Sequence, residues 1–417
     1  MDLNADNMIK INQKITTKEV LLITIFWLIW QFSLFLIGRL SDSFLRYSPT
    51  FPFYDNVLVQ TNQPRWLYSW ANFDGVHYLA IANYGYIGTG LVQAFLPFFP
   101  FVILHSIHLL CGDKCNLLLT GLTVTQLFSY GLALLWFAFV KKFQNQKIAW
   151  IALFGLYLFP TSFFLSAFYT ESIFLFATVL AFWSARQKNW PLMGVATAIA
   201  VSTRVVGVFL IPALVLDILI SQSWPESATY YIKHPLILVS KVWQILLQYR
   251  WAVAWLVFSL SGLLYYMSFL LHEFHDPFYF IHVQTQFNTG RQSEFILYPQ
   301  VLWRSLKILL DVRPFDWHYF AYAQEFMVGC AGLLALLWSL KSVRVSYVFF
   351  ALAAFLLPTT TGTFSSMPRY VLVCFPLFIV LAKMLQKRPL LMILWFAVST
   401  VLLVINTVLF IQGYWVA

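Results

Sequence analysis

The chain has 417 residues, of which 60% are hydrophobic and 19% are aromatic, whereas only 10% are charged. Soluble globular proteins contain about 25% charged residues, so this composition excludes that class and predicts an all-α polytopic membrane protein with a single integral membrane domain over residues 1–417. The net charge of +10 is scattered between apolar segments, which is typical of membrane loops and argues against a nucleic-acid partner.

The N-terminal segment is polar and contains Lys10, Lys14 and Lys18, and an apolar stretch from Val20 to Gly38 follows it. No cleavage site of small residues comes after this stretch, so we expect a retained signal anchor with a cytoplasmic N-terminus. The chain contains no Asn-x-Ser/Thr sequon, which favours a bacterial inner membrane over a eukaryotic secretory membrane.

Later apolar segments predict further membrane crossings. The segment 190–220 is too long for one crossing and has Arg204 near its middle, so we expect two short helices that bend at Thr203-Arg204. With this bend the total is about 11 crossings. The other segments are 116–140, 148–167, 170–185, 250–271, 319–340, 345–361, 370–385 and 390–412.

Residues 91–111 are long enough to cross a membrane, but their two prolines and two histidines are unfavourable in a lipid-facing helix. If this segment stays on the outer face, the cytoplasmic polar segments hold 16 of the 26 Lys and Arg residues, including those of a loop at 221–250. A true crossing would move 13 of those 16 outside, against the positive-inside rule. We therefore expect 91–111 to be re-entrant or to lie along the outer surface.

This topology gives two long outer loops, 39–115 and 272–318. We expect short amphipathic helices in the first loop, and the stretch ILYPQVLWRSLKILLDV in the second has the pattern of an interfacial amphipathic helix. Cys111 and Cys115 can form a disulfide if their loop faces an oxidising compartment, whereas zinc needs more ligands than this loop supplies. Cys330 and Cys374 lie in apolar segments and are expected in the core.

The stretch WANFDGVHYLAIANYGY at residues 70–86 follows the first apolar segment. Asp74, His77 and Tyr78 stand at i, i+3 and i+4, so a helix places them on one face. A carboxylate beside an apolar boundary costs solvation energy, and such residues are more often retained for chemistry or binding than for stability.

Other charged and polar residues fall on the same predicted outer side, and this convergence indicates a functional site. They are Tyr169 and Glu171 in SAFYTES, Arg204 in STRVVG, His275 and Asp276 in HEFHDPFYF, and Arg369 in SSMPRY.

Each candidate also has a purely structural alternative. Asp74 could cap a helix that starts at Gly75, and Glu171 could simply pair with Arg204. Arg369 could extend to lipid head groups, and His77 could donate to a backbone carbonyl. The adjacent His275 and Asp276 could shape only the turn before Pro277.

The stretch FDGVHYLAIANYGY followed by AFLPFFP resembles the PIG-V family of mannosyltransferases, which has bacterial relatives. The family places a Trp-Asp pair after its first span, and here Phe73 replaces the Trp, so an indole N–H is lost while the carboxylate remains. The stretches FPTSFFLSAFYTESIF, STRVVG and SSMPRYVLVCFPLF are similar to further parts of the family. The first motif matches at Asp74, His77, Tyr78, Ile81, Ala82, Gly85, Tyr86, Pro97 and Pro100.

The resemblance implies a membrane glycosyltransferase of the GT-C type. Such enzymes transfer a hexose, in this family mannose, from a polyprenyl-phosphate donor to a lipid- or glycan-linked acceptor on the outer face. The resemblance makes Asp74 the general base, and we expect Arg204 and Arg369 to stabilise the leaving phosphate. His77, Tyr78, Tyr169, Glu171, His275 and Asp276 are expected to contact the substrates.

Direct displacement with one carboxylate as base predicts inversion at the anomeric carbon. No metal or other cofactor is expected, because arginines can supply the electrostatic stabilisation. The alternative function is a membrane transporter or lipid flippase with an outward polar cavity. A non-catalytic membrane scaffold is the third possibility.

Overall fold

The computed structural model describes residues 14–49, 51–86, 91–222, 235–287, 292, 294–311 and 317–416. The N-terminal residues up to 13, which include Lys10, lie outside these ranges, as do residues 223–234 of the predicted cytoplasmic loop and short pieces of both predicted outer loops.

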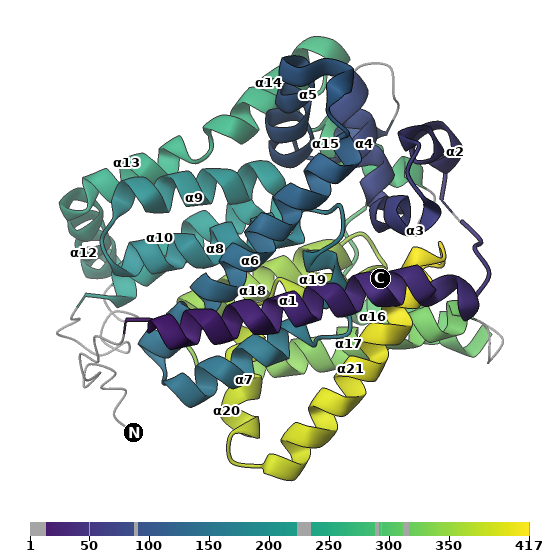
Figure 1. The fold of residues 1–417 in the computed structure, drawn as a ribbon. Helices are drawn as coiled ribbons and strands as arrows, with labels where there is room; N and C mark the ends of the chain where they lie inside the picture. The colour runs from purple at the N-terminus through teal and green to yellow at the C-terminus, as the bar shows by residue number, and fades with distance from the viewer. Residues whose placement is uncertain are drawn as a thin grey trace.

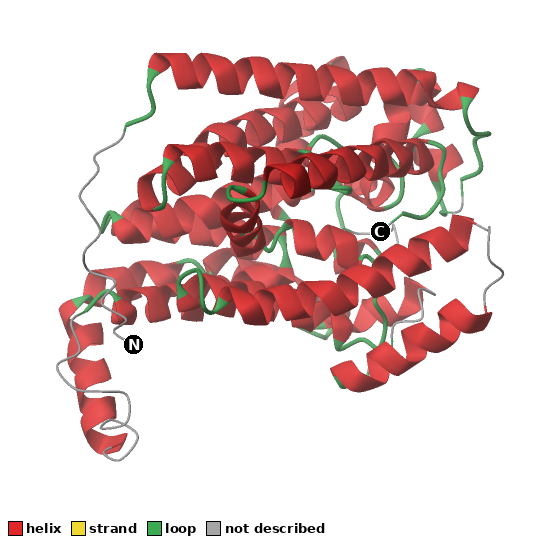
Figure 2. Cartoon of the chain, turned by 90° about the horizontal axis from the view of Figure 1, so that it is seen from below, coloured by secondary structure: helices red, strands yellow, loops and turns green. Residues whose placement is uncertain are grey.

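Helices make up the ordered elements throughout the described ranges, which contain no strand (Figure 2). The predicted all-α class is therefore confirmed for this part of the chain. The helices are α1 (Thr17–Leu40), α2 (Tyr54–Val57), α3 (Arg65–Tyr68), α4 (Asp74–Tyr84), α5 (Ser106–Cys111), α6 (Leu117–Phe143), α7 (Gln146–Tyr157), α8 (Glu171–Arg186), α9 (Trp190–Thr203), α10 (Leu210–Ile220), α12 (Pro235–Gln248), α13 (Arg250–Phe258), α14 (Ser261–Phe274), α15 (Tyr279–His282), α16 (Tyr298–Asp311), α17 (Trp317–Ser339), α18 (Val345–Thr359), α19 (Met367–Leu372), α20 (Pro376–Leu385) and α21 (Pro389–Ile411).

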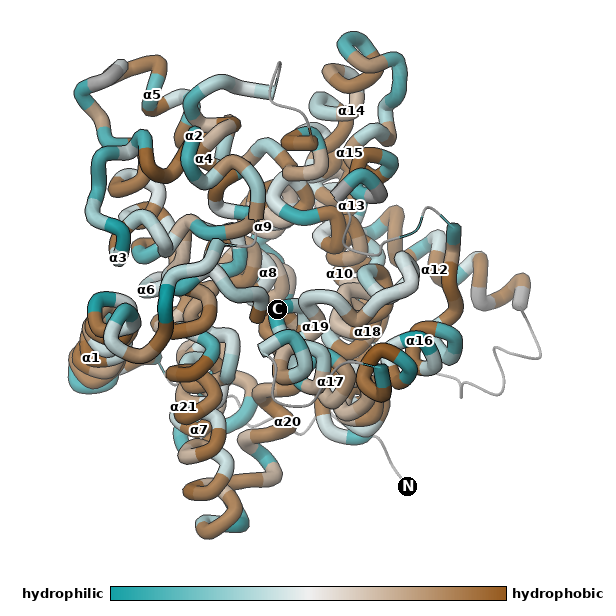
Figure 3. Tube along the Cα trace, turned by 90° about the vertical axis from the view of Figure 1, so that its right-hand side faces the viewer, coloured by the Kyte–Doolittle hydropathy of each residue, from teal (hydrophilic) through white to brown (hydrophobic). Residues whose placement is uncertain are grey.

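Five helical segments in the described residues are long and apolar enough to cross a membrane. Figure 3 shows apolar residues along α1 and α21, which belong to this set. The five match five of the predicted crossings, and the other crossings stay predictions. The segments are Thr17–Ser43, Leu117–Phe143, Arg250–Phe274, Trp317–Ser339 and Pro389–Ile411.

Several of the other predicted crossings form shorter helices than expected. The helix α7 ends at Tyr157, ten residues before the predicted end of the 148–167 segment, shortly before Pro160. The 370–385 segment is split before Pro376 into α19 and α20. Proline has no amide hydrogen and clashes with the preceding turn, which explains both interruptions.

The predicted break inside 190–220 is confirmed. The backbone of Arg204 is extended, with φ −145° and ψ 140°, so α9 ends at Thr203. A 3₁₀ helix from Val205 to Phe209 then leads into α10, which lies beside α9 (Figure 1). The break places the arginine at the end of α9, where its side chain is available to neighbouring elements.

The centre of the fold is formed by α8, which packs against both α6 and α9. Its other neighbours include α10 and the segment 162–165. At the periphery, α1 crosses the front of the molecule and meets the end of α21 (Figure 1). There Gln412 donates from Nε2 to Oγ of Ser41 at 2.6 Å.

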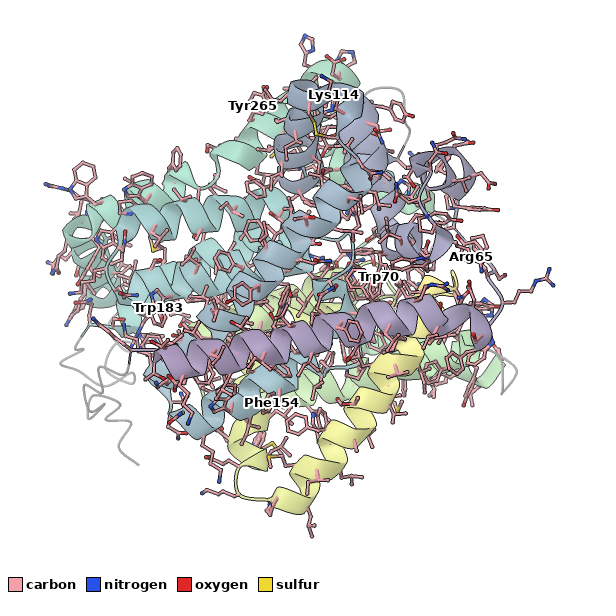
Figure 4. The ribbon with its side chains drawn as sticks, viewed as in Figure 1. Arg65, Trp70, Lys114, Phe154, Trp183 and Tyr265 are labelled. Atoms are coloured by element: carbon pink, nitrogen blue, oxygen red, sulfur yellow. A yellow bond between two sulfur atoms is a disulfide. The ribbon has the colours of Figure 1, made fainter. Side chains whose placement is uncertain are left out.

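The predicted outer loop 39–115 contains the expected short helices α2 to α5 and a π-helix over Phe98–His105. The π-helix and α5 form one 14-residue helical unit that packs against α4, where Nδ1 of His105 is 2.9 Å from the carbonyl oxygen of Ala82. Cys111 and Cys115 form a disulfide, visible beside Lys114 in Figure 4.

Two expectations outside this loop need correction, and one is confirmed. The predicted cytoplasmic loop 221–250 contains a helix, α12. The polar residues Ser240, Gln244 and Gln248 recur every four positions among apolar residues, which is the pattern of an amphipathic helix. Cys374 is buried as expected, but Cys330 is half-buried on α17. The predicted amphipathic helix in 272–318 is present as α16.

A hydrogen bond between distant segments sets the geometry near residue 70. The N–H of Phe168 donates to the carbonyl of Trp70 at 3.0 Å. Trp70 is fully buried, and its indole ring lies against Gly38 of α1 (Figure 4). A Cβ on Gly121 of α6 would lie 2.1 Å from the Phe168 ring, so glycine is needed for this approach. The segments that carry Asp74 and Glu171 are thus held side by side.

Two ion pairs lie at the opposite end of α8 from Glu171, near Arg186. Nζ of Lys141 is 2.8 Å from both carboxylate oxygens of Glu19, and both side chains are 6% exposed. Nε of Arg344 is 2.6 Å from Oδ1 of Asp217. The guanidinium carbon of Arg186 lies 5.1 Å from the ring centre of Phe143, two residues after Lys141, so the Glu19–Lys141 pair is near the C-terminus of α8, whose 16 residues span about 24 Å.

We predict that Lys141→Met destabilises the protein because it leaves the Glu19 carboxylate buried without its cation. The expected loss is about 3 kcal/mol in the free energy of unfolding. Thermal unfolding in detergent, compared with Lys142→Met one residue further along, measures it. The double variant Glu19→Gln/Lys141→Met should recover part of the loss. Equal melting temperatures for Lys141→Met and the parent would contradict the prediction.

Candidate active site

Asp74 follows a turn in an unusual backbone conformation. Phe73 has φ 56° and ψ −115°, a region that non-glycine residues rarely occupy. Asn72 ties this turn to the end of α21, because its Nδ2 donates to the carbonyl of Phe410 at 2.8 Å. The hydroxyl of Tyr169 donates to the carbonyl of Asn72 at 2.8 Å and accepts from the N–H of Asp74 at 3.2 Å. These contacts fix the position from which α4 begins.

The helix α4 begins at Asp74 itself, one residue before the position that the capping alternative requires. Asp74 therefore lies in the first helical turn, and its Oδ2 accepts a hydrogen bond from Nη1 of Arg369 at 2.5 Å. Its side chain is 32% exposed, against 9% for Arg369. The carboxylate thus reaches solvent-accessible space while one of its oxygens contacts a guanidinium.

Glu171 is the first residue of α8 and is fully buried. Its Oε1 accepts from Nη1 of Arg204 and from Nε of Arg369. The expected pair with Arg204 is confirmed, and the second arginine was not anticipated. The hydrogen bonds form a chain from Asp74 through Arg369 and Glu171 to Arg204.

Arg369 is 7% exposed, so the structural alternative in which it extends toward lipid head groups is wrong. Its guanidinium carbon lies 4.6 Å from the ring centre of Tyr169 and 5.1 Å from that of Phe164. Arg204 lies 5.6 Å from the ring centre of Tyr370. Stacking on aromatic faces is favourable for a weakly hydrated guanidinium.

The ends of the helices complement these charges. Asp74 and Glu171 occupy the first turns of α4 and α8, where the helix dipole favours an acid. Arg204 is the C-cap residue of α9, where the helix dipole favours a cation. Two acids and two arginines balance in formal charge, so the network can remain ionised although it is largely buried.

A cavity of about 570 Å³ opens beside this network. Asp74, Arg204 and Arg369 line it, whereas Glu171 lies behind the two arginines. The predicted residues His77 and Tyr78 also line it, whereas Tyr169 does not line it but holds the backbone of Asn72 and Asp74 through its hydroxyl. The wall is completed by Phe51, Pro52, Phe73, Ala94, Phe95, Leu96, Thr203, Val205, Val206, Ile281, Gln284, Leu357, Pro358, Thr360, Thr361, Ser366, Tyr370 and Trp415.

The ring of His77 is 6% exposed and stacks on Phe95, with 5.0 Å between ring centres. Burial lowers the pKa of His77, and the opposing field of Asp74 is the smaller effect. His77 is therefore neutral near pH 7. The hydroxyl of Tyr78 lies 3.4 Å from Oγ1 of Thr170, next to Glu171.

The structure does not bring His275 and Asp276 into this cluster. Asp276 accepts from the N–H of Phe278 at 2.9 Å, and its other oxygen is 2.6 Å from Nδ1 of His282. His275 adopts a left-handed conformation, with φ 56°, at the end of α14. Both residues shape the turn before α15, as the structural alternative for them stated.

Sequence reasoning missed several residues that complete the site. Asn72 and Phe95 stand inside the stretches WANFDGVHYLAIANYGY and AFLPFFP but were not singled out, and Trp415 is distant in sequence from every motif. Glu325 does not line the cavity but accepts a hydrogen bond from the indole of Trp415, and it could have been noticed, because an acid inside an apolar segment long enough to span a membrane is rare.

Within the described ranges, no group of three or more His, Cys, Asp or Glu side chains is arranged to hold a metal ion. The described chain is a helical protein with five apolar helices of membrane-spanning length and a polar site at the ends of several helices. The chain matches no family model, and no curated protein matches it significantly.

We predict that His77→Phe reduces the loss of stability on acidification. Because the folded-state pKa of His77 is below its unfolded value, the unfolded chain binds more protons below pH 6.5, and stability falls as the pH falls. Between pH 7 and pH 5 the melting temperature should drop less in His77→Phe than in the parent. His275→Phe, at an exposed turn, is the control. Identical pH profiles for parent and His77→Phe would contradict the prediction.

Proposed function

We propose that this protein is a membrane glycosyltransferase that transfers a hexose from a polyprenyl-phosphate sugar to a hydroxyl of a lipid- or glycan-linked acceptor. The observation that carries the proposal is one cavity lined by a partly exposed carboxylate, Asp74, and by two guanidinium groups, Arg204 and Arg369. A base for the acceptor and cations for a leaving phosphate are the groups that this chemistry needs.

In the proposed step, the acceptor oxygen forms a bond to the anomeric carbon while the bond from that carbon to the phosphate oxygen breaks. The acceptor proton passes to Asp74, and the polyprenyl phosphate leaves with the bonding electron pair. A single displacement inverts the anomeric configuration. A retaining route would require a second nearby carboxylate as nucleophile, but Glu171 is fully buried behind the arginines.

Arg204 is the better placed of the two arginines for the donor phosphate. Of its guanidinium nitrogens, Nη1 alone is hydrogen-bonded to described residues, to Glu171 and at 3.5 Å to Thr170. The remaining N–H groups of a guanidinium can bind two phosphate oxygens together. Arg369 contacts both acids, so phosphate binding that draws on Arg369 weakens its hold on Asp74 and makes that carboxylate more basic.

An apolar cavity of about 580 Å³ supports a lipid-linked donor. It lies between the π-helix, α9, α13 and α14, and its lining includes Pro97, Phe98 and Ser202. These residues directly follow Leu96 and precede Thr203, which line the polar cavity. A ligand with a phosphate at Arg204 can therefore extend an isoprenoid chain past these segments.

The finer statements about fold and location belong to the same proposal. The resemblance to PIG-V mannosyltransferases supports a GT-C type fold with about 11 crossings and mannose as the sugar. The charge distribution supports a cytoplasmic N-terminus and an active site on the outer face of a bacterial inner membrane. The disulfide between Cys111 and Cys115 supports an oxidising environment for that face.

We predict that Asp74→Asn lowers sugar transfer by at least 100-fold, because a positioned general base contributes that much. The assay follows labelled mannose from a synthetic polyprenyl-phosphate mannose into new glycosides in membranes that contain the protein. Asp55→Asn, at an exposed acid on α2, is the matched control. Near-normal turnover in Asp74→Asn would remove it from the mechanism, and substrate movement without a new glycosidic bond would favour a transporter.

We predict that Arg204→Ala raises the KM for the donor at least tenfold and changes the KM for the acceptor little. The reason is the loss of a charge-assisted contact to phosphate, while Glu171 keeps its contact with Arg369. Arg65→Ala, at an exposed arginine outside the cavity, is the control. An unchanged donor KM in Arg204→Ala would exclude it as the phosphate-binding residue.

A further inference from the structure

A second pocket, of about 330 Å³, adjoins the cavity that contains Asp74. It lies between α16, α17 and the turn that precedes α19. Trp415 lines both spaces and forms their shared wall, while Ser365 lines the pocket and the adjacent Ser366 lines the cavity. The polar or aromatic residues that line the pocket include Ser305, His318, Tyr322, Glu325, Ser365 and Trp415.

Glu325 is the acid of this pocket, and its residue is 4% exposed. It lies in α17, one of the five helices of membrane-spanning length, where an acid costs several kcal/mol. Its Oε1 accepts hydrogen bonds from the N–H of Ser366 at 2.8 Å and from Nε1 of Trp415 at 3.1 Å. The mechanism proposed above does not use this residue, so the cost needs another explanation.

Both donors connect Glu325 to the first cavity. Ser366 has φ 66°, a left-handed conformation that is unfavourable for a serine, and its carbonyl accepts from the N–H of Arg369 at 3.1 Å. The indole of Trp415 packs edge-on against Phe73 at 5.6 Å between ring centres, directly before Asp74. The side chain of Trp415 therefore stands between the pocket and the cavity that Asp74 lines.

The two spaces differ in charge. Arg204 and Arg369 line the first cavity and favour an anion, whereas no Lys or Arg occurs among the described residues that line the pocket. A carboxylate with aromatic and hydroxyl neighbours suits a neutral group with several hydroxyls, because the carboxylate accepts from O–H groups and the aromatic faces cover C–H surfaces. A phosphate would meet the acid of Glu325 and be disfavoured.

We propose that this pocket binds the acceptor through a sugar or polyol group, with Glu325 accepting from its hydroxyls and Trp415 and Tyr322 covering its apolar faces. This inference rests on the proposed transferase function. It makes Glu325 and Trp415 acceptor-binding residues, and it assigns the two substrates to separate spaces on either side of a shared wall.

The test uses the full chain in nanodiscs, with octyl α-mannoside as acceptor and polyprenyl-phosphate mannose as donor. Glu325→Gln should raise the acceptor KM at least tenfold and leave the donor KM and acceptor-independent donor hydrolysis within twofold. Trp415→Phe, which retains a ring but loses the N–H, should raise the acceptor KM by a smaller factor. Glu273→Gln, on α14 outside the pocket, is the matched control.

A donor KM that rises together with the acceptor KM in Glu325→Gln would overturn the proposal, because it would mean that Glu325 only holds the Ser366 turn and Arg369. An unchanged acceptor KM would also overturn it. If the parent transfers no sugar, the proposed function fails, and binding of methyl α-mannoside measured by ligand-observed NMR decides the pocket separately. A tenfold weaker affinity in Glu325→Gln then supports it, and equal affinity refutes it.

Discussion

The rest of the site depends on one buried carboxylate with two guanidinium partners. Glu171 has no exposed surface, and an isolated carboxylate in that position would be strongly destabilising. Arg204 and Arg369 compensate for it by donating to the same carboxylate oxygen, so the end of α9 and the helix α19 must both stay beside the start of α8. Arg369, which lies on α19, also donates a hydrogen bond to Asp74. A requirement of charge compensation therefore fixes the relative positions of three helices and of the candidate base.

The position of this network at helix ends has a further consequence. Asp74 and Glu171 begin helices and Arg204 ends one, so the helix dipoles favour each charge where it stands. The Glu19–Lys141 and Asp217–Arg344 pairs lie at the other end of α8. The apolar middle of the helices thus separates two groups of charges, an arrangement that suits a chain with polar chemistry at one boundary of a membrane.

Three neighbouring spaces in the structure each suit a different part of the two proposed substrates. An apolar cavity suits an isoprenoid chain, the cavity with the two arginines suits a phosphate, and the pocket with Glu325 suits hydroxyl groups. Separating an anionic donor from a neutral acceptor by the charge of each space reduces binding in the wrong place. Trp415 lies where the pocket and the cavity with the two arginines meet, so its indole forms part of the wall of both and provides no reactive group.

The sequence by itself determined the helical class, the five long apolar helices, the break at Arg204 and the candidate residues Asp74, Glu171, Arg204 and Arg369. These follow from hydropathy and from the cost of charge in apolar segments, both of which are local properties. Only the tertiary structure decided that Arg369 pairs with Asp74, that His275 and Asp276 lie away from the site, and that Asn72 and Trp415 join it. It also decided that Glu325 accepts a hydrogen bond from Trp415. Residues far apart in the chain make these contacts. The strained turns at Phe73 and Ser366 set the directions in which the neighbouring side chains point. Such conformations persist only because packing and hydrogen bonds from other segments hold them, which no local pattern encodes.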